Sequence, residues 1–218
     1  MSLIAVSLTS VEDVATGLAF VVFPALFLFG FGMHPGLRHP HVITDPAEMI
    51  ARAHGNRLLH VGHVAVLAAC PLLIVIVIDY TGLLAGSSSE WAGLAGASLA
   101  VIGVIGLAAD KGALCLTMSA FDTLPEAEFA QLTPGLRALY AKAGWMVLVW
   151  AVVLLPVGFA VLAVALLASD ALPAWQGIAL LAGSLLLLVP DGLELISLTG
   201  CVLLAVAMIP TGVQLLGG

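Results

Sequence analysis

The sequence predicts an all-α integral membrane protein, a bundle of six transmembrane helices in a single domain that spans residues 1–218. Hydrophobic residues make up 62% of the chain and charged residues only 9%, whereas a soluble domain needs about 25% charged residues. The apolar residues gather in segments of about the 20 residues that a helix needs to cross a bilayer core. Lys and Arg are confined to connections between those segments. Lipid is therefore the expected solvent of this chain.

The first three predicted spans are 14–33, 58–78 and 91–109. Each is an apolar run of the length that crosses a bilayer at about 1.5 Å of rise per residue. The third carries a small residue at every third or fourth position, and these residues are Gly93, Gly96, Ala100, Gly103 and Gly106. Small side chains let helix backbones approach closely in lipid, so we expect this helix to be central in the bundle.

The last three predicted spans are 144–168, 174–189 and 195–216. The fourth and sixth have the full length of a membrane helix. The fifth is shorter because the turn residues 190–192, Pro-Asp-Gly, stop it. A five-span alternative stays open, in which 174–216 forms one span and a re-entrant piece.

The positions of the cations predict how the bundle lies in the membrane. All six Lys and Arg residues fall in the connections 34–57 and 110–143, while the connections 79–90 and 169–173 hold acidic residues and no cation. Cytoplasmic loops carry an excess of Lys and Arg. We therefore expect 34–57 and 110–143 to be cytoplasmic and both the amino and carboxyl termini to be outside, in a plasma membrane or bacterial inner membrane.

Both cytoplasmic connections carry signals for short interfacial helices. Residues 45–48 combine Asp45 as an N-cap, a Pro at the first helical position and a Glu placed to reach back to the cap. Residues 123–126 and the pair Thr133-Pro134 repeat this pattern. We expect these helices to lead into the second and fourth spans.

A weak internal repeat relates 71–106 to 156–191. In the first stretch a Pro is followed twenty residues later by Trp91, and in the second a Pro is followed nineteen residues later by Trp175. Each Trp begins a similar run rich in Ala, Leu and Gly. The pattern predicts two parallel repeats, as some transporters have, although shared composition is the simpler explanation.

Prolines inside four spans predict irregular helices. They are Pro24, Pro71, Pro156 and Pro210. Proline lacks a backbone donor and its ring clashes with the carbonyl four residues earlier, so it kinks or breaks a helix. Kinked helices can open a ligand-sized cavity between them, and they can also simply pack.

His60 and His63 are the sharpest polar signal inside a predicted span. They are three residues apart and share a helix face, and Gly62 between them lets another backbone come close. His63 lies roughly 7–8 Å into the span, where an ionisable group usually faces the protein interior and has a partner. Asp110 closes the third span on the same side, so its pairing with His60 or His63 is geometrically possible.

Several functions are consistent with this polar cluster. Our leading hypothesis is binding or transport of a small molecule, a lipid or a cation through His60, His63 and Asp110. Asn56 and Arg57 flank the cluster at the inner mouth, where they would bind an anionic headgroup or phosphate if they do more than set topology. The two histidines would otherwise relay protons, or bond only to neighbouring carbonyls and lipid headgroups.

Two alternatives belong to other functional classes. In a metal- or haem-dependent membrane enzyme, His60, His63 and Asp110 suit Zn or Fe, with His34 or His54 completing the metal site, or one histidine binds haem. The other alternative is a structural subunit of a membrane complex.

The remaining polar residues and the net charge bound the choice of partner. The histidines outside the span are expected to be ordinary inner-loop residues, and these are His34, His39, His41 and His54. The formal net charge of −7 argues against nucleic acid, whose phosphates require clustered cations. The expected partners are the lipid bilayer, a small-molecule or lipid ligand, and a second copy or a subunit of a membrane complex.

Overall fold

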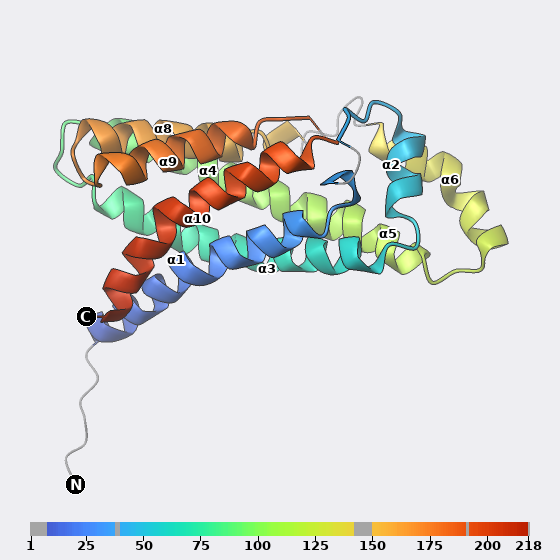
Figure 1. The fold of residues 1–218 in the computed structure, drawn as a ribbon, viewed down its shortest axis with the longest axis horizontal. Coiled ribbons are helices and arrows are strands. Elements are labelled where there is room, and N and C mark those ends of the chain that lie inside the picture. Colours follow the sequence, from blue (N-terminus) through green and yellow to red (C-terminus); the bar gives the residue numbers. More distant parts are fainter. Residues whose placement is uncertain (1–7, 38–39, 142–149, 191, 218) are drawn as a thin grey trace, which may run out of the picture.

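The computed structural model describes residues 8–37, 40–141, 150–190 and 192–217, and every regular element within them is helical. Most of the helices run along one long axis (Figure 1). In chain order they are α1 (Leu8–Gly32), α2 (Pro46–Ala53), α3 (Arg57–Gly82), α4 (Glu90–Asp110), α5 (Leu116–Phe121), α6 (Glu126–Tyr140), α8 (Leu154–Ala168), α9 (Ala174–Leu186) and α10 (Glu194–Gly217). A 3-10 turn, η1 (Pro35–Leu37), follows α1, and a π-helical segment, η2 (Lys111–Cys115), joins α4 to α5.

Four helical stretches within the described residues are long and apolar enough to cross a membrane. They are Val11–Gly32, Arg57–Gly82, Glu90–Phe121 and Glu194–Gly217. The third is longer than predicted, because α4, η2 and α5 form one continuous rod. α8 and α9 are apolar but shorter, at 15 and 13 residues. The first residues of the predicted fourth span, 144–149, lie outside the described residues.

The six apolar helices form a closed ring in chain order. α1 packs on α3, α3 on α4, α4 on α8, α8 on α9, and α9 on α10, while α10 returns to pack on α1. α1 begins and α10 ends at one end of the ring (Figure 1), which we call the terminal end. The opposite end, which we call the histidine end, is formed by α2, α5, α6 and the starts of α3 and α10. The predicted small-residue helix, α4, is thus one member of the ring rather than its centre.

Glycines bring the helix backbones of the ring together. A Cβ added at Gly96 of α4 would lie 2.9 Å from the carbonyl oxygen of Gly158 on α8, and one added at Gly103 would overlap the backbone of Leu155. Similar contacts join glycines of other neighbouring helices, namely Gly17 with Gly212, Gly30 with Gly62, and Gly183 with Gly200. The close approach that small residues favour in lipid therefore occurs at four interfaces of the ring.

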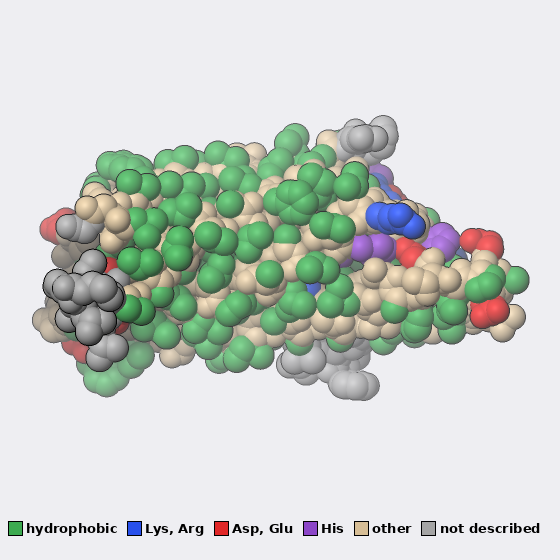
Figure 2. Space-filling view, turned by 90° about the horizontal axis from the view of Figure 1, so that it is seen from below, with side chains coloured by type: hydrophobic (Ala, Val, Ile, Leu, Met, Phe, Trp, Pro, Cys, Tyr) green, Lys and Arg blue, Asp and Glu red, His purple; other side chains and the backbone are tan. Residues whose placement is uncertain are grey.

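Apolar side chains fill the ring toward the terminal end. Phe20 and Tyr80 meet edge to face with ring centroids 5.1 Å apart, and Leu166 and Met208 are fully buried in the same core. The outward face is also apolar, and Figure 2 shows hydrophobic side chains covering most of one side between the charged ends. A helix bundle that is apolar both inside and outside is typical of a protein surrounded by lipid.

A small separate core holds the cap at the histidine end together. Ile50 of α2 and Phe129 of α6 pack there with Leu59 and Met118. α2 begins as predicted, because the Asp45 side chain accepts a hydrogen bond of 2.8 Å from the backbone N–H of Ala47.

Two details of the cap differ from the sequence prediction, and the four prolines of the spans do not all lie in the same setting. Glu48 does not reach back to the N-cap but pairs with Arg52 at 2.8 Å. α6 runs through Pro134 without interruption, so the pair Thr133-Pro134 starts no helix. Of the four prolines, Pro156 lies in the first turn of α8, just after a turn at residues 152–153 that interrupts the helix, while the other three lie inside continuous helices. The two members of the predicted repeat both form helical hairpins, and their duplication stays a prediction.

Candidate functional site

A cavity of about 490 Å³ opens inside the ring near the histidine end. Its apolar wall includes Phe27, Phe31, Val66, Leu107, Leu155 and Pro156. Its polar and charged residues are His34, His63, Asp110, Lys111, Glu194 and Ser197. A mostly apolar pocket with a few convergent polar groups is the usual form of a small-molecule site.

Glu194 is the more buried of the two carboxylates that line this cavity. It is the first residue of α10 and is only 6% exposed. Its Oε1 accepts a hydrogen bond of 3.0 Å from the backbone N–H of Gly192 and lies 3.2 Å from His34 Nδ1. The backbone of Gly36 in η1 presses against the carboxylate, because a Cβ added there would overlap it. Its Oε2 is buried and has no hydrogen-bond partner among the described residues.

His63 lies in the wall of the same cavity. Gly62 packs against Gly30, as the sequence suggested, and this contact brings α3 against the end of α1. The imidazole rings of His63 and His34 meet edge to face, with centroids 5.6 Å apart. His63 is 8% exposed, and its Nδ1 is buried without a hydrogen-bond partner among the described residues.

Asp110 and Lys111 stand on the α4 side of the cavity. Lys111 Nζ lies 3.0 Å from Asp110 Oδ2, so the predicted carboxylate has a lysine as its ion-pair partner rather than a histidine. The pair marks the start of the π-helical segment η2, where backbone hydrogen bonds join residues five apart rather than four. Such segments are rare and are found frequently at functional sites.

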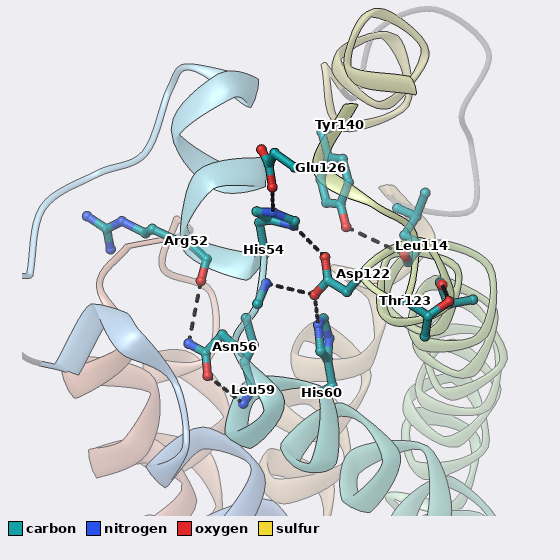
Figure 3. Close-up of polar contacts among 12 residues, drawn as sticks. Arg52, His54, Asn56, Leu59, His60, Leu114, Asp122, Thr123, Glu126 and Tyr140 are labelled. Carbon is teal, nitrogen blue, oxygen red and sulfur yellow. Dashed lines mark hydrogen bonds and ion pairs between the residues drawn. The ribbon is translucent and has the colours of Figure 1, made fainter. Parts of the chain in front are cut away.

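His60 belongs to a different cluster, which we call the Asp122 cluster (Figure 3). Asp122 Oδ2 accepts hydrogen bonds from His60 Nε2 at 2.6 Å and from the backbone N–H of Gly55 at 2.9 Å. Its Oδ1 lies 2.7 Å from His54 Nδ1, and His54 Nε2 lies 3.3 Å from Glu126 Oε2. The cluster therefore ties the start of α3 to the connection between α5 and α6.

The pairing of His60 with Asp110 is wrong for a geometric reason. The apolar run predicts an end of the third span near Asp110, but the rod continues for eleven residues to Phe121. At about 1.5 Å per residue, that extension carries Asp122 to the level of His60, whereas Asp110 stays deeper in the ring.

The electrostatics of the Asp122 cluster follow from its hydrogen bonds. Burial alone would raise the pKa of Asp122, but hydrogen bonds from His60, His54 and Gly55 together hold that pKa below its ordinary value. The hydrogen bond to Asp122 raises the pKa of His54, against burial and with help from Glu126. A charged imidazole beside a charged carboxylate is thus the favoured state of this pair.

Asn56 and Arg57 have local positions that explain them without a ligand. The Asn56 side chain caps α3 by accepting a hydrogen bond of 3.1 Å from the backbone N–H of Leu59. Its Nδ2 donates to the carbonyl oxygen of Arg52 at 3.5 Å. Arg57 is the exposed first residue of α3. Their binding of an anionic group stays a prediction.

The residues proposed as metal ligands do not converge. Asp110 and His63 line the cavity, while His60 bonds to Asp122 outside it. Across the described parts of the chain, no three His, Cys, Asp or Glu side chains are arranged to hold a metal ion. The haem and complex-subunit interpretations have no further observation in their favour.

Sequence reasoning missed two members of these sites, Asp122 and Glu194. It named His34 and His54 only as possible completing metal ligands and otherwise treated them as loop residues. The available signal for Glu194 was its position as a carboxylate directly before the last predicted span, on the same side as the histidine-rich connection. Comparison of the chain with protein-family models, with curated proteins and with solved structures gives no match.

Proposed function

We propose that this chain is a six-span membrane protein whose cation-bearing connections are cytoplasmic and whose cavity binds a small ligand. The single observation that carries the binding proposal is the pair of buried polar groups facing it. Glu194 and His63 are each more than nine-tenths buried, and each holds a polar atom without a hydrogen-bond partner among the described residues. Burying polar atoms without partners is costly, and a bound ligand would supply the missing partners.

The distribution of side chains supports the membrane arrangement. Three of the four described cations, Arg52, Arg57 and Arg137, belong to the histidine end, and the fourth, Lys111, lies within the third apolar stretch, in the half nearer that end. At the opposite end Trp91 and Trp175 are exposed, at 81% and 52%, where indole rings commonly sit at a membrane surface. α8 and α9 lie along the same long axis as the longer stretches, which supports counting them as two further spans (Figure 1).

The filled half of the ring favours binding over free passage. The cavity ends against Phe27 and Leu155, beyond which Phe23, Leu73 and Met208 close the interior. A site closed toward one membrane face holds a ligand that enters from the other. Transport would require these side chains to move apart.

Thiol labelling tests the topology. Ser88→Cys lies in the loop between α3 and α4, and Ala127→Cys lies on the exposed side of α6. The three native cysteines are buried and give little background. A membrane-impermeant maleimide should label Ser88→Cys in intact cells and Ala127→Cys only after permeabilisation. The reverse pattern would overturn the proposed orientation.

Equilibrium dialysis tests the binding site. The probe is 1-naphthylmethanol, a neutral aromatic alcohol, with protein in lipid nanodiscs and the uptake of empty nanodiscs subtracted. Leu107→Trp should fill the cavity and abolish saturable binding, because Leu107 lines it and is buried. Ile105→Trp is the matched control, since Ile105 lies on the same helix but is 57% exposed. Equal binding to both variants would refute the cavity as the site.

A further inference from the structure

We propose that the cavity selects an organic cation, an amphipathic molecule whose ammonium group binds Glu194 while its apolar body lies against the wall. This inference rests on the proposed binding function and specifies the class of ligand. Four features carry it: the local charge balance, the missing partner of one carboxylate oxygen, the aromatic wall and the volume.

Among the described residues, the charged groups that line the cavity leave one carboxylate without a Lys or Arg partner. Lys111 and Asp110 face each other at 3.0 Å and neutralise one another. The remaining carboxylate is Glu194, whose neighbours are a backbone N–H and the imidazole of His34. The imidazole of His34 carries a charge only when it is protonated, so above the ordinary pKa of imidazole it does not compensate the carboxylate.

The unpartnered oxygen sets the chemistry of the ligand's polar group. Both groups that hold the carboxylate approach Oε1, while Oε2 is buried against the backbone of Gly36 and has no hydrogen-bond partner among the described residues. Glu194 can only accept while it is ionised, so the ligand must donate. An ammonium N–H does so while restoring charge balance, and charge-assisted hydrogen bonds are about twice as strong as neutral ones.

The wall of the cavity accommodates the rest of such a molecule. Phe27, Phe31 and Trp150 line it, and aromatic faces attract cations within about 6 Å of the ring centroid. His63 is a second polar side chain in this wall. The volume of about 490 Å³ fits a molecule larger than a hydrated metal ion and within the range of small organic ligands.

Three naphthalene compounds of nearly equal size separate charge from shape. They are 1-naphthylmethylammonium, 1-naphthylmethanol and 1-naphthoate, measured by equilibrium dialysis with the protein in nanodiscs. The measurement is made at pH 8, above the ordinary pKa of imidazole. The wild-type protein should bind the ammonium compound about tenfold or more tightly than the alcohol, as expected for a hydrogen bond to a charged group. Binding of 1-naphthoate should be the weakest.

Glu194→Gln tests whether this carboxylate is responsible. The substitution keeps the size of the side chain and resembles a protonated Glu194, so it should remove the preference for the ammonium compound while affinity for the alcohol stays within about threefold. Glu128→Gln is the matched control, because Glu128 is an exposed glutamate on α6 at the same end of the molecule. The wild-type series does not depend on any variant, so the proposal stays testable if Glu194→Gln misfolds.

The outcomes distinguish this inference from the binding proposal. If the alcohol and the ammonium compound bind equally and Leu107→Trp abolishes both, the cavity binds ligands but the cation inference is overturned. If Glu194→Gln leaves the ammonium preference intact, the assignment of Glu194 is overturned. If no compound binds in a way that Leu107→Trp prevents, both proposals fail.

Discussion

Replacing Asp122 with alanine should release the cap from the ring without unfolding the ring. Asp122 accepts hydrogen bonds from His60, His54 and the backbone of Gly55, at 2.6, 2.7 and 2.9 Å. Its side chain and that of His60 are each only 10% exposed. The substitution therefore removes a partner from groups that have little access to water.

The expected magnitude follows from this burial. Removing one member of a buried pair typically costs about 3–5 kcal/mol, because the other member loses its partner. We expect about 3 kcal/mol, the lower end, because His54 is 31% exposed and can regain water. At about 1.4 kcal/mol for each factor of ten, local opening of the cap should become roughly a hundredfold more frequent.

Hydrogen exchange measured by mass spectrometry in nanodiscs gives this value segment by segment. Backbone amides of α2 and α6 should exchange about a hundredfold faster in Asp122→Ala, while those of α8 and α9 should be unchanged. Glu126→Gln is the control, because the Glu126 side chain is 82% exposed and exposed pairs contribute about 1 kcal/mol or less. Equal exchange in Asp122→Ala and wild type would refute the role of the cluster, and uniform acceleration would refute the separation of cap and ring.

Three further predictions concern pH, packing and capping. The pKa of His54 is raised above 6.5 and that of Asp122 is lowered below 3.8 in the folded protein, so the cap should be most stable between about pH 3.8 and pH 6.5. Its stability should fall as the pH rises through the folded-state pKa of His54 and as the pH drops through that of Asp122. Hydrogen exchange of α2 and α6, corrected for the intrinsic pH dependence of exchange, measures this. Gly158→Ala forces a Cβ into the α4 backbone and should cost about 1–3 kcal/mol, whereas Gly82→Ala meets nothing within 4 Å and should not destabilise; thermal unfolding in detergent compares them. Asn56→Ala should cost about 1 kcal/mol through loss of the α3 cap, which the same unfolding assay measures.

The sequence predicted where the helices lie along the chain better than it predicted which helices pack against each other. Runs of apolar residues located the six apolar helices, and the Asp45 cap located α2, because both signals are local. Small residues predicted close packing, which occurs at Gly96 and Gly103. The position of α4 in a ring could not be predicted, since a pattern within one helix does not say which other helices surround it.

The candidate site was only half visible for the same reason. His63 and Asp110 were recognised because each lies inside or at the edge of an apolar run, and both line the cavity. Glu194 meets His34 across 160 positions of sequence, through the contact of the last helix with the first. Asp122 was missed because apolar residues after Asp110 gave no clear end to the third span.

The closing contact between α1 and α10 also determines when the site can exist. As the chain is synthesised, His34 and His63 are made well before Glu194, which belongs to α10. Until Gly212 of α10 packs against Gly17, the ring remains open between α1 and α9. The cavity therefore gains its carboxylate only once α10 has been made, and a nascent chain that stops after α9 lacks it.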